Sequence, residues 1–179
     1  MANRVAKFEK ISYEQFEKDF YGSFTLKQMM NFGILNRDPE YIYNHIKLPE
    51  RATKFSAGYD FYSPIPFTLK PGKYVKIPTG IRCRMNNDYV LQIYPRSSLG
   101  FKYMLIPMNL VAIVDCDYYD SDNEGHIFIK LKNCGDQTVA IDVGDAICQG
   151  IFVTYGITED DNVHTSRNGG IGSTNNKKE

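Results

Sequence analysis

Residues 95–100 read Pro-Arg-Ser-Ser-Leu-Gly and directly follow an apolar run. Arg96 would offer a phosphate group a forked cation. Ser97 and Ser98 would add hydroxyl donors, beside a glycine that lets backbone amides approach closely. The stretch therefore suits phosphate binding. Because Arg-Ser-Ser also occurs in ordinary turns, the residues alone favour a plain turn.

Residues 109–118 read Asn-Leu-Val-Ala-Ile-Val-Asp-Cys-Asp-Tyr, an apolar run that ends in two carboxylates. Asp115 and Asp117 are two residues apart, so both would point to the same side of a strand. A carboxylate at a strand end can serve as the general base for a bound water. A solvated turn after a buried strand is the alternative, and the residues alone favour it.

Two further stretches combine glycine with one polar side chain. Residues 144–150 form a turn into a strand, with the amide of Gln149 among apolar neighbours, which an ordinary hairpin would also explain. Residues 167–174 join Arg167 to several glycines. Such a segment is either a flexible end or a flap that becomes ordered over an anionic ligand.

The first of two regions that must position these residues is helical. Residues 1–45 predict two or three short helices, because Ser12–Gln15 and Thr25–Gln28 fit capping boxes and Asp38–Pro39 opens a third helix through Tyr43. Their aromatic face predicts packing on the main domain or on a partner protein.

The second region begins near residue 46 and consists of short alternating runs. Ile127, Ile129 and Leu131 alternate with more polar neighbours, the period of a strand with one buried face. Similar runs lie near residues 59–62, 73–77, 80–85, 89–94, 110–114, 139–143 and 147–155. Many short strands with no long helix between them predict an all-β sandwich, jelly roll or barrel.

The composition excludes several classes of protein. The 179 residues carry 21 Lys+Arg and 21 Asp+Glu, and this zero formal net charge argues against nucleic-acid or anionic-membrane binding. No apolar run approaches the roughly 18 to 20 residues that span a bilayer. The N-terminus lacks the apolar stretch of a signal peptide, so we expect a cytoplasmic protein. The 4 Cys and 3 His lack zinc-ligand spacing, which predicts buried or inert thiols.

Residues 57–60 read Ala-Gly-Tyr-Asp and, with the four stretches above, give five motifs in order. On these motifs, residues 47–174 resemble the trimeric deoxyuridine triphosphatases (dUTPases). The resemblance implies an all-β fold, an antiparallel jelly-roll-like distorted barrel at residues 46–160. A short helical N-terminal extension at residues 1–45 and a glycine-rich C-terminal arm at residues 161–179 complete the expected organisation.

The resemblance also implies an activity and an assembly. Members of that family hydrolyse dUTP to dUMP and pyrophosphate by attack of water on the α-phosphorus, which limits uracil incorporation into DNA and supplies dUMP for dTMP synthesis. The implied assembly is a homotrimer with shared active sites. Each site takes motifs one, two and four from one chain, motif three from a second and motif five from a third. The implied cofactor is Mg²⁺.

By the same resemblance, Asp115 orients and deprotonates the attacking water. Tyr118 packs under the sugar, where a 2′-hydroxyl would clash. Asn109 reads the uracil edge, and Asp60 holds Mg²⁺ through water. The residues implied to hold the triphosphate are Arg96, Ser97, Ser98, Gln149 and Arg167, with the amides of Gly170, Gly172 and Ser173.

The sequence departs from the family pattern at three places. Motif three ordinarily continues as Tyr-x-Gly, but here residues 119–125 follow the tyrosine, which predicts a longer hairpin tip. Motif five has only Asn168 before Gly-Gly and carries Ile171 where the family has an aromatic. Apolar cover then replaces stacking on uracil, unless another aromatic substitutes. The helical extension is the third departure.

Two other functions are alternatives. A dUTPase fold can serve as a nucleotide-sensing regulatory protein that docks a partner through its N-terminal helices, although the retained Asp115 and Arg167 favour catalysis. The related dCTP deaminases share the barrel but need a glutamate in the strand after motif three. Residues 126–132 contain no carboxylate.

Overall fold

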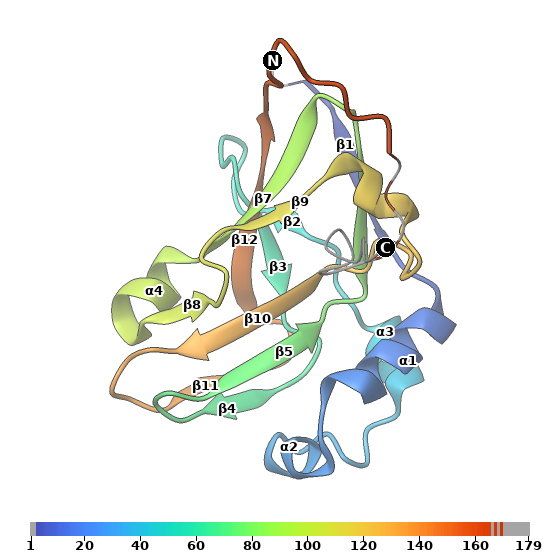
Figure 1. Ribbon diagram of the computed structural model, residues 1–179. Helices are drawn as coiled ribbons and strands as arrows, with labels where there is room; N and C mark the ends of the chain where they lie inside the picture. Colours follow the sequence, from blue (N-terminus) through green and yellow to red (C-terminus); the bar gives the residue numbers. More distant parts are fainter. Residues whose placement is uncertain (1–2, 166, 168, 170–179) are drawn as a thin grey trace, which may run out of the picture.

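The structure is a computed structural model that describes residues 3–165, 167 and 169 (Figure 1). Its strands are β1 (Ala6–Lys10), β2 (Glu50–Arg51), β3 (Tyr59–Tyr62), β4 (Phe67–Leu69), β5 (Tyr74–Pro78), β6 (Ile81–Met85), β7 (Tyr89–Pro95), β8 (Leu105–Pro107), β9 (Ala112–Val114), β10 (Phe128–Asn133), β11 (Val139–Ile141) and β12 (Ala146–Thr154). Its helices are α1 (Tyr13–Ser23), α2 (Leu26–Asn31), α3 (Pro39–Asn44), α4 (Ser97–Tyr103) and the 3-10 helix η1 (Cys116–Asp120).

These strands form sheets in which every neighbouring pair is antiparallel within the described residues. The sheet orders are β1-β6, β5-β10-β8, β11-β4 and β2-β3-β12-β7-β9. The prediction of an antiparallel all-β fold is confirmed. None of the helices in the described part of the chain is long and apolar enough to cross a membrane.

The five-stranded sheet has β12 at its centre. Gln149 of β12 lies opposite Asp60 of β3 on one side and opposite Tyr94 of β7 on the other. The next residue, Gly150, is buried, and a Cβ there would lie 2.8 Å from Cδ1 of Leu91. A glycine at this position therefore lets the neighbouring strand pack its side chain over β12, which supports this register.

The predicted N-terminal helices are present and begin at their predicted caps. Ser12, Thr25 and Asp38 each accept a hydrogen bond from a backbone amide at the start of the following helix. Phe16 and Phe20 of α1 are fully buried and belong to the same core cluster as the barrel residues. Of the two predicted alternatives, the main domain or a partner, the structure shows these helices packing on the main domain, and Figure 1 shows α1 near β5.

The structure adds β1 and α4, which the sequence did not reveal. β1 pairs with β6 over its full length, although its sequence Ala-Lys-Phe-Glu-Lys contains no β-branched residue. Its Phe8 packs on Phe61, with ring centroids 5.6 Å apart. Backbone pairing and aromatic packing, rather than strand propensity, hold this segment. α4 begins at Ser97, within the stretch that was expected to end a strand.

The segment at residues 119–125 is longer than the family pattern, but it is not a simple hairpin tip. It leaves η1 and turns back onto the N-terminal region, where the backbone amide and hydroxyl of Ser12 donate to the Glu124 carboxylate at 2.7 and 2.6 Å. Gly125 has φ +70°, and a Cβ there would lie 2.7 Å from Cα of Tyr119. This close turn requires glycine.

His126 follows this turn and is fully buried. Its Nε2 accepts a hydrogen bond from the Gly80 amide at 2.8 Å, so its proton is on Nδ1, which donates to Oδ2 of Asp19 at 2.6 Å. Burial lowers the pKa of His126 and outweighs the opposing effect of the Asp19 carboxylate. Burial raises the pKa of Asp19, but hydrogen bonds from His126 and Gln15 lower it by more. The pKa of Asp19 is therefore below its ordinary value.

We predict that acidification destabilises the fold through this pair. The unfolded chain protonates His126 near pH 6.5, whereas the folded chain keeps it neutral to lower pH, so added protons favour unfolding. Asp19, whose pKa is also lowered, acts in the same direction at lower pH. Urea unfolding between about pH 7.5 and pH 5 should show a loss of up to ~1.4 kcal/mol per pH unit from this histidine.

His126→Gln is the matched control for this measurement. Glutamine retains one donor and one acceptor but does not titrate. The free energy of unfolding of this variant should depend less on pH than that of the native chain. Equal slopes in the two proteins would contradict a buried neutral histidine.

Candidate active site

The first group of predicted site residues gathers where β3, β12 and β7 lie side by side. The strand register brings Asp60, Gln149 and Pro95 together. Nε of Arg96 lies 3.2 Å from Oδ1 of Asp60, whose side chain is only 13% exposed. Nε2 of Gln149 donates to the backbone oxygen of Pro95 at 3.0 Å. Motifs one, two and four therefore meet in one chain.

Gly58 makes room within this group. A Cβ at residue 58 would lie 2.5 Å from Oε1 of Gln149, so a larger residue would displace the amide. Gly58 belongs to motif one, but the motif alone implied no role for it. The close approach of β3 to β12 that requires glycine here became visible only in the structure.

Ser97 and Ser98 open α4 and are exposed, and Arg96 is the residue that caps this helix. Arg96 makes no capping hydrogen bond with its side chain. Instead, the guanidinium points to Asp60 and to the backbone oxygen of Ala146, at 3.5 Å. A basic group and two hydroxyls thus share the junction between β7 and α4.

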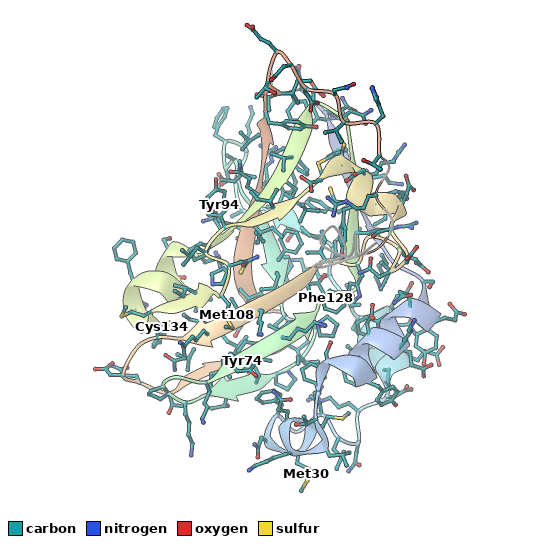
Figure 2. All side chains as sticks on the ribbon, in the orientation of Figure 1. Met30, Tyr74, Tyr94, Met108, Phe128 and Cys134 are labelled. Carbon is teal, nitrogen blue, oxygen red and sulfur yellow. The ribbon has the colours of Figure 1, made fainter. Side chains whose placement is uncertain are left out.

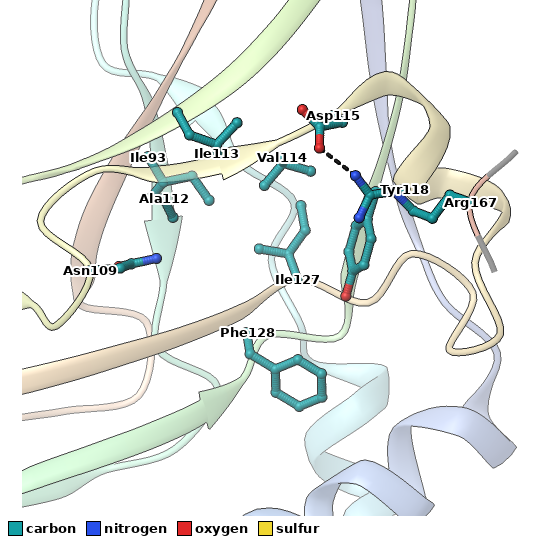
Figure 3. Close-up of a pocket in the computed structure, with 10 residues that line it drawn as sticks. All are labelled: Ile93, Asn109, Ala112, Ile113, Val114, Asp115, Tyr118, Ile127, Phe128 and Arg167. Carbon is teal, nitrogen blue, oxygen red and sulfur yellow. Dashed lines mark hydrogen bonds and ion pairs between the residues drawn. The ribbon is translucent and has the colours of Figure 1, made fainter. Parts of the chain in front are cut away.

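The second group lines a pocket of about 270 Å³ beside β9 and β10 (Figure 3). The lining residues are Ile93, Asn109, Ala112, Ile113, Val114, Asp115, Tyr118, Ile127, Phe128 and Arg167. The predicted residues Asn109, Asp115, Tyr118 and Arg167 therefore come together here. Phe128, an aromatic that lines this pocket, was not among the predicted residues. Its place beside the pocket depends on how β10 lies against β9.

Asp115 and Tyr118 are positioned by η1. Asp115 caps this helix without a side-chain capping bond, which leaves its carboxylate directed to other partners. Tyr118 is buried, and its hydroxyl donates to the backbone oxygen of His126 at 2.7 Å and accepts from Nδ2 of Asn123 at 2.8 Å. Burial raises the pKa of Tyr118, so the phenol stays protonated and presents its ring as a packing surface.

Arg167 binds the two carboxylates predicted to share one side. It donates to Asp115 (Figure 3), and its Nε donates to Oδ1 of Asp117 at 2.8 Å. Its guanidinium carbon lies 5.9 Å from the centroid of the Tyr118 ring. The pairing with Asp117 was not anticipated, because residues 117 and 167 are far apart in sequence. The predicted residues Gly170, Gly172 and Ser173 lie outside the described residues.

Within these groups, Arg96 and Asp115 lie towards opposite ends of β7. Leu91 pairs with Val114 of β9, and Pro95 pairs with Cys148 of β12. Leu91 and Pro95 are ~13 Å apart at about 3.3 Å per residue, and Asp115 and Arg96 each lie one residue further out. An arginine side chain cannot span this separation. Arg96 and Asp115 therefore cannot contact one phosphate within a single chain.

Comparison with known proteins identifies the family. The dUTPase family profile matches residues 44–177. The chain belongs to the dUTPase family. The match begins at the end of α3, so almost all of the helical extension lies outside it.

Individual relatives agree with this assignment. The chain is 39% identical over 132 residues to a deoxyuridine 5'-triphosphate nucleotidohydrolase of Lactococcus lactis subsp. lactis, with 72% of this chain and 88% of that protein covered. The crystal structure of dUTPase from Streptococcus mutans is 37% identical, with a TM-score of 0.57 and coverage of 63% of this chain and 88% of that one. This likeness supports the expected jelly-roll-like barrel.

A more distant structure shares the fold. A variant of the dUTPase from phage phi11 of S. aureus is 22% identical with a TM-score of 0.55, and 66% of this chain and 90% of that chain are covered. That structure reveals the coordination of a structural Mg(II) ion in the phage protein.

Proposed function

We propose that this dUTPase-family chain hydrolyses dUTP to dUMP and pyrophosphate by attack of water on the α-phosphorus. Its membership of the family and its likeness to the Lactococcus lactis enzyme support this activity. The observation that carries the proposal is Asp115 at the rim of a pocket that also contains Tyr118 and Asn109. In the cytoplasm, where we place the protein, this reaction limits uracil incorporation into DNA and supplies dUMP for dTMP synthesis.

The nucleoside would occupy the pocket. Its volume of about 270 Å³ suits a pyrimidine, and its apolar walls include Ile93 and Phe128. The amide of Asn109 offers a donor and an acceptor for the uracil edge. Cytosine would leave these groups mismatched, and an unpaired polar group in a closed site is costly. The ring of Tyr118 would pack under the sugar and exclude a 2′-hydroxyl.

Catalysis requires a base and neutralisation of charge. Asp115 would hold a water, take its proton as the new bond to the α-phosphorus forms, and thus act as general base. The bond from the α-phosphorus to the α–β bridging oxygen breaks, and pyrophosphate leaves with the electron pair of that bond. Arg96, Ser97, Ser98 and Gln149 would hold the α- and β-phosphates in line for this displacement.

Arg167 would contact the γ-phosphate from the C-terminal arm, with the amides of Gly170, Gly172 and Ser173. Its present partners are the carboxylates of Asp115 and Asp117. In the proposed assembly Arg167 would leave these carboxylates for the γ-phosphate of a nucleotide bound at Asp115 of another subunit, and its departure would free Asp115 of its own chain to hold a water.

The residues near the phosphate site fit an Mg²⁺ ion held mainly by water and substrate. Within the described part of the chain, no group of three or more His, Cys, Asp or Glu side chains could hold a metal ion. Mg²⁺ commonly keeps several waters and takes other ligands from substrate phosphates. Asp60, beside Arg96, would hold waters of the ion. When bound, the ion would neutralise charge on the triphosphate.

We infer shared active sites from the separation of Arg96 and Asp115 along β7, and we propose a homotrimer because the family resemblance implies one. The α-phosphate must meet both Arg96 and Asp115, so the two residues must come from different subunits. Exposed apolar side chains in α4, in β9 and in the segment between β8 and β9 favour an interface: Phe101, Leu110 and Ile113 are 91%, 66% and 56% exposed, and Met108 (Figure 2) is exposed as well. Arg167 would come from a third subunit.

Asp115→Asn tests the proposed base. Loss of the base should lower kcat for dUTP by about 10²–10⁴-fold. Pyrophosphate release with Mg²⁺ should be compared for dUTP, dTTP, dCTP and UTP, with the native chain releasing it from dUTP alone. Ammonia release from dCTP would identify a deaminase instead. Tight binding of dUTP without turnover by the native chain would identify a nucleotide sensor.

Mixing two inactive chains tests the shared site. If Asp115 and Arg167 act from different subunits, every mixed trimer of Asp115→Asn and Arg167→Ala chains contains one site with both native residues. Random mixing at equal amounts should then restore about a quarter of native activity. Each variant alone, unfolded and refolded in the same way, is the control. If the mixture stays as inactive as the two controls, both residues act within one chain.

A further inference from the structure

The position of Tyr118 depends on the backbone of His126. The Tyr118 hydroxyl donates to the backbone oxygen of His126 at 2.7 Å, and Asn123 donates to that hydroxyl at 2.8 Å. Both partners come from the segment that follows η1. A shift of the backbone at residue 126 would therefore move the ring of Tyr118 in the pocket.

The side chain of His126 fixes that backbone to α1. Its Nδ1 donates to Asp19 at 2.6 Å, and its Nε2 accepts from the Gly80 amide at 2.8 Å. Asp19 is itself held by Nε2 of Gln15, at 2.9 Å. The imidazole is fully buried and has its two ring nitrogens satisfied, so it cannot turn without breaking a bond.

A second contact joins the same segment to the extension. Glu124 accepts from the amide and hydroxyl of Ser12, and the Tyr119 hydroxyl donates to Glu9 at 2.6 Å. Glu124 and Tyr119 both lie in residues 119–125, which replace the shorter family pattern. The longer segment and the N-terminal extension thus form the two sides of one contact.

The His126 side chain also contacts a residue that lines the pocket, Phe128. The ring centroids of His126 and Phe128 are 4.2 Å apart, and Phe128 lines the pocket. The His126 imidazole, which Asp19 holds, therefore contacts Phe128 in one wall of the pocket. The backbone oxygen of His126 supports Tyr118 in another wall.

We propose that the N-terminal helices position the sugar-binding tyrosine, with Asp19 and His126 as positioning residues for Tyr118. The inference rests on the proposed function, because it assigns Tyr118 to the deoxyribose. It gives the extension a role within its own subunit: Asp19 holds His126, His126 holds the Tyr118 hydroxyl, and the ring then closes the space that a 2′-hydroxyl would need.

Asp19→Ala tests this inference through sugar discrimination. The ratio of kcat/KM for dUTP to that for UTP should fall about threefold to tenfold, mainly through a higher kcat/KM for UTP, because the loosened ring no longer fills the space that a 2′-hydroxyl needs. The value of kcat should change little, because Asp115 is unaltered. Asp19→Asn retains an oxygen that can accept from Nδ1 of His126, so this variant should keep most of the native ratio.

Met29→Ala is the control for a general loss of stability. Met29 is buried in α2 and belongs to the same core, but it is not among the hydrogen-bonded residues that hold the 119–126 segment. Its truncation should lower the melting temperature and leave the dUTP/UTP ratio unchanged. All variants should be assayed well below their own melting temperatures.

A double-mutant cycle identifies the route. Tyr118→Phe removes the hydroxyl through which His126 acts, so adding Asp19→Ala to Tyr118→Phe should reduce the ratio by much less than in the native background. If Asp19→Ala does not fold, Glu124→Ala releases the second contact and should lower the ratio in the same direction.

The outcomes separate this inference from the proposed function. Absence of dUTP hydrolysis by the native chain would overturn the proposed function. A native chain that discriminates sugars, together with an Asp19→Ala variant of unchanged ratio, would overturn the inference alone. An equal fall in ratio for Met29→Ala, or full additivity in the double mutant, would also overturn it.

Discussion

The register of β12 between β3 and β7 is the constraint on which the site depends. It places Gln149 opposite Asp60 and Tyr94, next to the turn that carries Arg96. Because β7 also pairs with β9, the same ladder sets the separation between Arg96 and Asp115. A one-residue slip in this register would turn every side chain of β12 to the other face of the sheet. It would thereby disrupt the cluster of residues proposed to bind phosphate.

The same separation explains why the chain would act as an assembly. Within each subunit, Arg96 lies near one end of β7 and Asp115 lies towards the other. These two residues cannot contact the same α-phosphate within the chain, so catalysis would depend on how neighbouring subunits pack together. The exposed apolar side chains of α4 and of the β8–β9 segment would be buried at the interface between subunits.

Local chemistry in the sequence predicted much of the fold. Ser12, Thr25 and Asp38 marked helix starts because capping depends on residues within one turn, and alternating runs marked most strands. β1 was missed because its pairing with β6, rather than its own residues, makes it a strand. The Asp19–His126 bond, between residues 107 apart in sequence, had no local signal.

The site was predicted only in part, again because contacts between residues far apart in sequence leave no local signal. Motif order pointed to Asp115, Tyr118, Asn109 and Arg167, and the structure brings these residues to one pocket. The roles of Gly58 and Phe128 depend on how distant strands approach one another. Such contacts are set by tertiary packing, which residue spacing within a motif does not encode.

The most direct test of the account is a crystal structure of the assembled protein with a dUTP analogue whose α–β bridging oxygen is replaced by an imido group. The α-phosphate should contact Arg96 and Gln149 of one subunit, while Asp115 and Tyr118 of a neighbouring subunit face the same nucleotide. An analogue bound to Arg96 and Asp115 of one and the same subunit would contradict the account.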